Sequence, residues 1–200
     1  MKLILSAFLI MGIVVFGLPS LGLAIPYTAN LAGTLEDPSN TSPGYGFTTI
    51  DLDTVLHTLY VRVEFSNLDG GTTASHIHGP TSSPGTGNAG IITQTPTFSG
   101  FPLGVTSGNY EQTFDTTLAS TWNPSFIIAY GGTPGGAETA FDSFLLAGTA
   151  YLNIHTTIYP GGEIRGFFKP SPVPEPATML LLGSGLIGLA GFGRKKFLKK

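Results

Sequence analysis

The stretch Leu59-Tyr60-Val61-Arg62-Val63-Glu64-Phe65 alternates apolar and polar side chains without interruption. Successive side chains of a β-strand point to opposite faces, so the alternation places the apolar side chains on one face and the polar ones on the other. One face of such a strand is buried and the other lies in water, as in antiparallel sheets. Residues 55–65 therefore predict a half-buried antiparallel strand.

Similar short runs, separated by turn sequences such as Asp69-Gly70-Gly71, fill the central part of the chain. About seven to nine short strands with Gly and Pro turns predict an all-β fold, an antiparallel β-sandwich of Greek-key type. We expect a short helix at 140–147 and strands at 27–35, 45–52, 55–65, 74–78, 91–98, 110–114, 149–155 and 163–168.

Composition and charge exclude several classes of function. The 200 residues include 28 Gly and 15 Pro, which favour strands and turns over helices. Residues 25–170 carry three basic and eleven acidic side chains, a net charge of −8, whereas nucleic-acid binding needs a basic surface. The chain has no cysteine, which excludes disulfides, thiol nucleophiles and thiolate metal sites.

The N-terminal segment has the pattern of a secretory signal peptide. Lys2 precedes an apolar run at 3–18, and Gly22-Leu23-Ala24 supplies the small residues of a cleavage site. We expect the export machinery to recognise residues 1–24 and signal peptidase to cleave after Ala24. An uncleaved membrane anchor is the alternative.

The C-terminal segment has three parts in order: Pro174-Glu175-Pro176, an apolar stretch at 177–193 and a basic end at 194–200. As a helix the apolar stretch would be about 25 Å long, near the minimum for crossing a bilayer. The basic end would then stay on the cytoplasmic side.

This ending resembles the PEP-CTERM sorting signal of Gram-negative bacteria. The resemblance implies an intermediate in the inner membrane and processing at the motif by an exosortase. It further implies a final place at the cell surface or in the extracellular matrix, in association with exopolysaccharide and biofilm. An ordinary C-terminal membrane anchor is the alternative.

Histidine is the residue type that suggests a site. In His76-Ile77-His78 the two histidines project from the same face of an expected strand. Two neutral imidazoles so placed can bind one metal ion at about 2 Å, and His155 would join them if its strand is a neighbour. The set predicts a site for one Zn or Cu ion with an open coordination position; a polar network without metal is the alternative. His57 is expected to be structural.

Three further residues are expected near these histidines. Asn153 precedes His155 by two positions, and Glu163 and Arg165 share a face of the last strand. A partly buried carboxylate beside a metal site can orient an imidazole. For Glu163 and Arg165 the favoured interpretation is a structural role, in which they pair with each other or with neighbours.

The segments that carry the histidines and the last strand resemble the CHRD domain. They are His76-Ile77-His78-Gly79-Pro80, Leu146-Ala147-Gly148, Tyr151-Leu152-Asn153-Ile154-His155-Thr156 and Pro160-Gly161-Gly162-Glu163-Ile164-Arg165-Gly166. The resemblance covers about 27–168 and implies a β-sandwich domain. The H-x-H strand is also similar to the copper-ligand strand of Cu/Zn superoxide dismutases, which are β-sandwiches too. The chain departs from that pattern because it has no cysteine and only four histidines, so dismutase activity is not expected.

These observations predict a signal peptide at 1–24, a CHRD-like domain at 25–170 and a sorting signal at 171–200. No G-x-S-x-G nucleophile motif or carboxylate pair of a glycosidase stands out in the sequence. The favoured hypothesis is an exported, non-catalytic module of the cell surface or biofilm matrix with one metal ion. The alternatives are a redox or hydrolytic metalloenzyme that uses the same histidines, and a membrane-anchored adhesin.

Overall fold

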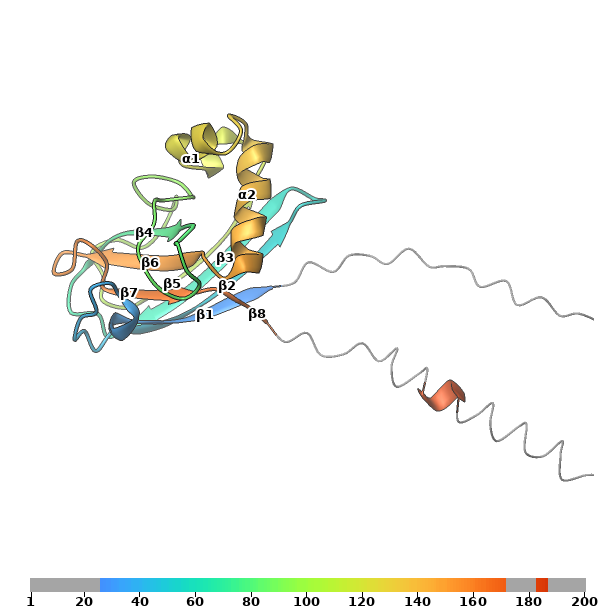
Figure 1. The fold of residues 1–200 in the computed structure, drawn as a ribbon. Helices are drawn as coiled ribbons and strands as arrows, with labels where there is room; N and C mark the ends of the chain where they lie inside the picture. Colours follow the sequence, from blue (N-terminus) through green and yellow to red (C-terminus); the bar gives the residue numbers. More distant parts are fainter. Residues whose placement is uncertain (1–25, 172–182, 187–200) are drawn as a thin grey trace, which may run out of the picture.

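The structure, a computed structural model, describes residues 26–171 and 183–186. The described residues form eight strands, two α-helices, two short 3₁₀-helices and one helical turn at 183–186 (Figure 1). In chain order the elements are β1 (Tyr27–Ala32), η1 (Gly33–Leu35), β2 (Tyr45–Asp53), β3 (Thr58–Ser66), β4 (Thr72–His78), β5 (Gly108–Asp115), η2 (Ala119–Thr121), α1 (Pro124–Ala129), α2 (Pro134–Ala147), β6 (Tyr151–Thr156), β7 (Ile164–Phe167) and β8 (Lys169–Pro170).

The alternating stretch of the sequence forms β3, as predicted. Leu59, Val61 and Val63 are fully buried, whereas Arg62 and Glu64 on the opposite face are exposed. Antiparallel hydrogen bonding joins β3 to β2 on one side and to β5 on the other. One face of β3 therefore belongs to the core, and the other lies in water.

The strands belong to one antiparallel sheet in the order β4-β6-β7-β1-β2-β3-β5, and β8 pairs with the start of β1. The prediction of an all-β fold with seven to nine antiparallel strands is confirmed. The sheet curls into a half-barrel (Figure 1), so one continuous sheet supplies the inner faces of the sandwich-like domain. Ile77 of β4, Leu152 of β6 and Val61 of β3 meet in its apolar core.

The segment at 79–107 connects β4 and β5, which are the two ends of this sheet. The Ile92 N–H donates to the Ile77 carbonyl and the Gly104 N–H donates to the Thr72 carbonyl, both at 2.8 Å. These bonds occupy the outer edge of β4. The edge therefore does not present a row of unpaired backbone groups, which would invite aggregation.

The predicted strand at 91–98 is wrong. Only two isolated bridges occur there, and no regular ladder. Pro96 has no backbone N–H and cannot continue a ladder of hydrogen bonds. The apolar residues that suggested a strand serve the core instead, because Ile92 and Phe98 are almost completely buried.

Helix α2 confirms the helix predicted at 140–147 and begins earlier. The Thr133 hydroxyl accepts a hydrogen bond from the first turn, and Gly148 ends the helix with a φ of 68°, which glycine adopts without strain. The buried face of α2 packs on the core through Phe141, whose ring centroid lies 6.0 Å from that of Trp122.

The two ends of the domain lie side by side. Strand β8 pairs with β1 through Tyr27 and Pro170, and the Ser171 N–H donates to the Pro26 carbonyl at 2.8 Å. The chain therefore enters and leaves the domain at one place (Figure 1).

The predicted terminal helices fall almost entirely outside the described residues. This applies to the signal peptide at 1–24 and to the apolar segment at 177–193 except for the turn at 183–186. Within residues 26–171 and 183–186, no helix has the length and apolar character needed to cross a membrane.

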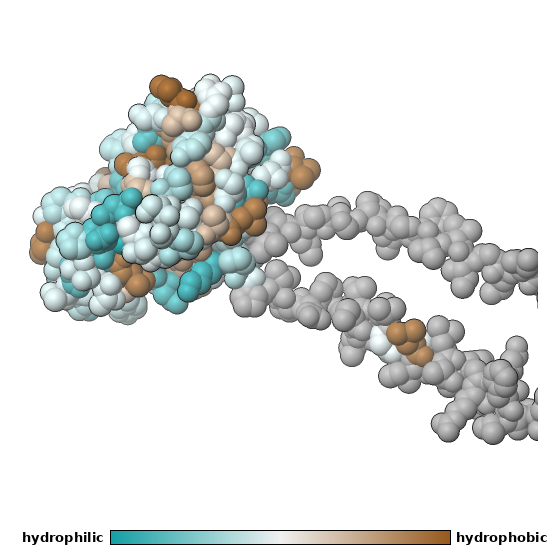
Figure 2. All heavy atoms as spheres, viewed as in Figure 1, coloured by the Kyte–Doolittle hydropathy of each residue, from teal (hydrophilic) through white to brown (hydrophobic). Residues whose placement is uncertain are grey.

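The surface of the domain is mostly polar. Figure 2 shows apolar side chains as scattered spots on the face in view. Among the exposed apolar side chains, Val55 and Leu56 at the turn between β2 and β3 are 82% and 72% exposed. Exposed apolar side chains of this kind are common on folded domains.

Substitution of Phe141 tests how α2 contributes to stability. We expect Phe141→Ala to lower the free energy of unfolding by about 3–5 kcal/mol, because it leaves a cavity beside Trp122. Leu146→Ala in the same helix is the control, since Leu146 is 67% exposed, and it should change stability by less than about 0.5 kcal/mol. Chemical denaturation of the full chain in detergent, followed by circular dichroism, measures both; equal losses would contradict the packing described.

Candidate metal centre

Three histidines meet on the face that β4 and β6 share. The strands are antiparallel neighbours, and their register places His76 opposite Asn153 and His155 opposite Ala74. One nitrogen from each of His76, His78 and His155 lies within 4.8 Å of the other two. The structure therefore brings together the three predicted ligands, and the ion itself stays a prediction.

A backbone carbonyl holds each of the three rings. The nitrogen–oxygen distances are 2.6, 3.0 and 2.9 Å for His76, His78 and His155, and the carbonyls belong to Pro96, Ala89 and Pro160, respectively. A carbonyl oxygen only accepts hydrogen bonds, so the nitrogen that faces it carries a proton. The other nitrogen of each neutral ring then carries a lone pair.

These second nitrogens have no partner. His76 Nδ1, His78 Nε2 and His155 Nε2 are buried and make no hydrogen bond. A buried polar atom without a partner costs about 1–3 kcal/mol, so native proteins seldom keep one without a bound ion or water. Three such lone pairs, on rings that each bring one nitrogen within 4.8 Å of the other two, are typical of a metal site.

Burial keeps the three rings neutral. It lowers the pKa of His76 and of His78 to about 4, and it lowers the pKa of His155 as well. The hydrogen bonds to carbonyls oppose this shift, because they favour the protonated ring. At neutral pH all three rings are therefore in the form that binds metal ions.

Arg165 supports the loop that holds His78. Its buried guanidinium donates to the Gly87 carbonyl at 3.1 Å and to Asn88 Oδ1 at 2.8 Å. Arg165 Cζ also lies 4.9 Å from the ring of Tyr151, and this ring stacks on His78 with 5.1 Å between centroids. Arg165 thus acts on the histidines indirectly, through the loop and the tyrosine.

Glu163 does not contact the histidines. Its fully buried carboxylate accepts hydrogen bonds at 2.6–3.2 Å from Ser42 Oγ, the N–H groups of Asp69 and Gly70, and Thr156 Oγ1. Among the described residues none of its hydrogen bonds reaches an imidazole, so the role expected for it as an orienting partner is absent. Nor does Glu163 pair with Arg165, which lies 3.8 Å from Glu36 Oε2.

Asn153 lies beside the histidines as expected, and the structure adds Glu36. A Cβ placed on Gly162 would lie 2.6 Å from Asn153 Oδ1 and 2.8 Å from Glu36 Oε1, so these two oxygens are close neighbours. Glu36 follows η1 and is buried. No motif or spacing links it to the histidines, so sequence reasoning could not single it out.

His57 stands apart from the other histidines. It occupies the turn between β2 and β3 with a φ of 55°, and its Nδ1 lies 2.9 Å from Glu138 Oε2 on α2. The contact joins the hairpin to the helix, which is the structural role expected for His57.

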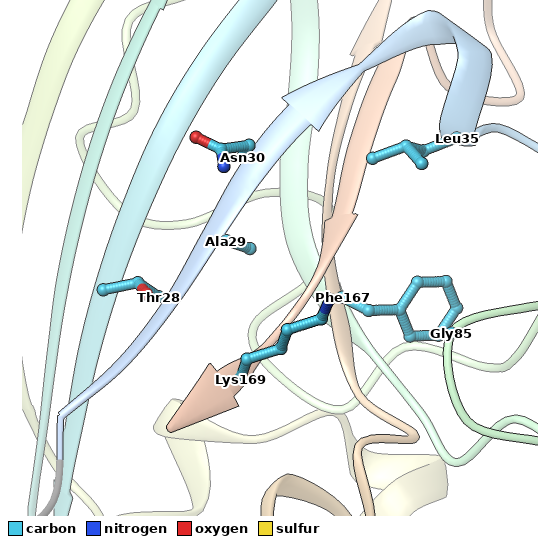
Figure 3. A pocket seen from close by; sticks show the side chains of 7 residues that line it. All are labelled: Thr28, Ala29, Asn30, Leu35, Gly85, Phe167 and Lys169. Atoms are coloured by element: carbon cyan, nitrogen blue, oxygen red, sulfur yellow. The ribbon is translucent and has the colours of Figure 1, made fainter. Parts of the chain in front are cut away.

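A surface pocket of about 300 Å³ lies along β1 (Figure 3). Its lining includes Leu35, Phe167 and Lys169 but none of the histidines. The candidate metal centre is therefore not part of this pocket.

The donor set determines which ions would fit. Three neutral imidazoles suit Zn²⁺ or Cu²⁺, whereas Mg²⁺ and Ca²⁺ prefer oxygen ligands. Around an ion with 2.0–2.1 Å bonds, tetrahedral nitrogens lie about 3.4 Å apart. The nitrogens now lie within 4.8 Å, so ring movements of about 1 Å would complete the site.

Two family models match the chain. The model of the CHRD domain matches residues 27–168, and that of the PEP-CTERM protein-sorting motif matches residues 172–195. Both resemblances found in the sequence are confirmed. No curated protein and no solved structure matches the chain. The sorting motif marks an exported surface protein of Gram-negative bacteria that an exosortase processes.

Glu36 gives the domain a specific pH dependence. Burial raises the pKa of Glu36 to about 7, although the charge of Arg165 and a hydrogen bond from the Asn153 side chain oppose the rise. The folded state then binds more protons than the unfolded state between the ordinary pKa of 4.5 and about 7. The stability that the protonated carboxyl contributes is present below pH 4.5 and is lost as the pH rises through 7.

Glu36→Gln should remove this dependence, because glutamine resembles the protonated carboxyl. We expect the variant to gain stability relative to the wild type as the pH rises from 5 to 8. Denaturation of both full chains at several pH values, in detergent and with chelator present, measures the difference. Parallel pH curves for the two proteins would contradict the raised pKa.

Proposed function

We propose a function on the premise that the chain belongs to the CHRD domain family and ends in a PEP-CTERM sorting motif. The protein is made with a signal peptide at 1–24, which signal peptidase removes after Ala24. Residues 25–170 form the working domain, and residues 171–200 are the sorting signal. The pattern Gly22-Leu23-Ala24 and the close ends of the domain support this division.

The sorting signal holds the exported domain at the inner membrane before it reaches the surface. In this proposal the apolar segment at 177–193 spans the membrane, and an exosortase cleaves at Pro174-Glu175-Pro176. The domain is then delivered to the cell surface or to an extracellular matrix that contains exopolysaccharide. Its acidic, mostly polar surface suits such a hydrated environment.

In the matrix the domain acts as a non-catalytic module that holds one Zn or Cu ion through His76, His78 and His155. The observation that carries this proposal is a set of three histidines that each have one buried, partnerless nitrogen. Each of the three rings also brings a nitrogen within 4.8 Å of the other two. Their carbonyl anchors hold the rings so that the lone pairs remain available. The ion would satisfy these atoms and stabilise a domain that has no disulfide.

A second candidate is a redox or hydrolytic metalloenzyme that uses the same histidines. It is favoured by the number of ligands, because three protein ligands leave an open position, as in catalytic zinc sites. Access weighs against it, since His76 and His78 are only 5% and 8% exposed. A structural ion therefore fits the burial better than a substrate site does.

Metal analysis of the purified full chain in detergent tests the site. After dialysis against Zn²⁺ or Cu²⁺ we expect one bound ion per chain. His76→Ala and His155→Ala should each lower metal affinity by more than the roughly 10- to 100-fold loss typical of outer partners, because each removes a ligand. His57→Ala is the matched control and should bind like the wild type, since His57 contacts Glu138 instead.

The outcomes separate the candidates. A wild-type chain that binds no stoichiometric metal would exclude both the structural and the enzymatic version. Bound metal without turnover of superoxide or an ester is the expected result. Turnover that His76→Ala abolishes and His57→Ala retains would favour the metalloenzyme.

Mass spectrometry of protein from the surface of the producing cells tests the sorting route. We expect a mature chain that lacks 1–24 and ends near Pro174-Glu175-Pro176. Glu175→Ala should retain the C-terminal tail, because it alters the motif, whereas Ser171→Ala outside the motif should be processed normally. A mature surface protein that still ends at Lys200 would support the anchored adhesin instead.

A further inference from the structure

Unsatisfied polar atoms concentrate at the candidate metal centre. Among the described residues, six buried side-chain nitrogen or oxygen atoms have no hydrogen-bond partner. Three are the imidazole nitrogens, and two more are Asn153 Oδ1 and Glu36 Oε1; the sixth belongs to Asp51 on β2. Since native proteins pair nearly all such atoms, five at one place indicate bound species and not a random defect.

Asn153 lies beside the histidines, and Glu36 lies beside Asn153. Asn153 is directly opposite His76 across the β4–β6 pair, and it lies two residues from His155 on the same face of β6. Glu36 Oε1 adjoins Asn153 Oδ1, because both lie within 2.8 Å of the position of a Cβ on Gly162. Glu36 is not one of the groups within 4.8 Å that could bind the ion directly. It belongs to a layer outside the ligands.

All five atoms accept hydrogen bonds when Glu36 is ionised. The rings donate through their other nitrogens, and the oxygens of an amide and of a carboxylate have only lone pairs to offer. A cation satisfies the three nitrogens but does not reach both oxygens. The Asn153 amide lies close enough to the Glu36 carboxyl to lower its pKa. No donor among the described residues, however, meets Glu36 Oε1 or Asn153 Oδ1 in hydrogen-bond geometry, so these two oxygens can accept from a bound molecule.

We propose that the open position of the metal centre binds an exchangeable water molecule, which donates its two hydrogen bonds to Asn153 Oδ1 and Glu36 Oε1. This inference rests on the metal site proposed above and names the ligand class that the site accepts. The ion would bind the lone pair of the water, and the two oxygens would accept hydrogen bonds from its two O–H groups. The same arrangement selects small protic ligands and disfavours small anions that have no proton, because such anions would face a carboxylate.

Gly162 is part of this arrangement. Its φ of 135° and the closeness of Asn153 and Glu36 leave no room for a side chain, since a Cβ would lie within 2.8 Å of both. The absence of a side chain at this position therefore leaves the Asn153 and Glu36 oxygens uncovered on the side of Gly162.

Azide binding to the Co²⁺-loaded full chain in detergent tests the proposal. Co²⁺ is a visible probe, because its absorption changes when a ligand at the open position is exchanged. We expect Glu36→Gln to bind azide at least about tenfold more tightly than the wild type, since the glutamine amide donates to an anion that the carboxylate repels. Asn153→Leu removes the other acceptor and should shift the same equilibrium in the same direction.

Asp51→Asn is the matched control, because Asp51 also has a partnerless buried oxygen but lies on β2. It should bind Co²⁺ and azide like the wild type. If Glu36→Gln does not fold, as judged by circular dichroism, Asn153→Leu decides. Equal azide affinities in all proteins that bind Co²⁺ would overturn the water proposal alone. Failure of the wild type to bind Co²⁺, Zn²⁺ and Cu²⁺ would overturn the metal site and this inference together.

Discussion

The antiparallel pairing of β4 with β6 is the constraint on which the candidate centre depends. His76 and Asn153 are 77 positions apart in the chain, and the pairing makes them direct neighbours. Side chains along each strand alternate between the two faces, so that Ile77 and Leu152 point into the core while the histidines occupy the opposite face. A shift of one residue in the register of either strand would move its apolar side chains to the outer face and its histidines into the core. The burial of Ile77 and Leu152 therefore fixes the strand register that brings the three histidines together.

Buried ionisable groups hold the loops around this strand pair. Arg165 joins the η1 loop to the loop after β4, because it contacts the Leu35 carbonyl and Asn88 Oδ1. Glu163 holds the turn after β3, because its carboxylate accepts hydrogen bonds from the Asp69 and Gly70 N–H groups. Each charge is surrounded by hydrogen bonds, which offset the free energy of removing it from water. In a domain without cysteine these groups fix the loops in the way that disulfides do elsewhere.

Sequence reasoning predicted what depends on local pattern. The alternation at 59–65 gave a correct strand, and the H-x-H spacing together with His155 gave the three residues that meet. It was wrong at 91–98, where apolar residues line a loop that follows the edge of β4 without forming a ladder. A pattern of apolar residues predicts which side chains are buried, but it does not predict the partners of the backbone hydrogen bonds.

The parts that sequence reasoning missed depend on tertiary contacts alone. Glu36 lies beside Asn153 because the chain after η1 folds back toward Gly162, and no periodicity in the sequence encodes that approach. Glu163 was expected near the imidazoles because it shares a face of the last strand with Arg165, yet its carboxylate accepts hydrogen bonds from the N–H groups of Asp69 and Gly70. A strand pattern assigns a face only within the ladder, and Glu163 lies just before the start of β7.

The energetics of the three imidazole nitrogens favour a bound ion at this site. Three partnerless nitrogens at about 1–3 kcal/mol each are a large fraction of the roughly 5–15 kcal/mol that stabilises a typical domain. Apolar residues at His76, His78 and His155 would avoid this loss, whereas a bound ion converts it into a gain. The hydrogen bonds to carbonyl oxygens fix each ring so that its second nitrogen can bind a ligand. An ion that binds only the folded domain raises its free energy of unfolding. This contribution would matter most in an exported domain that lacks disulfide cross-links.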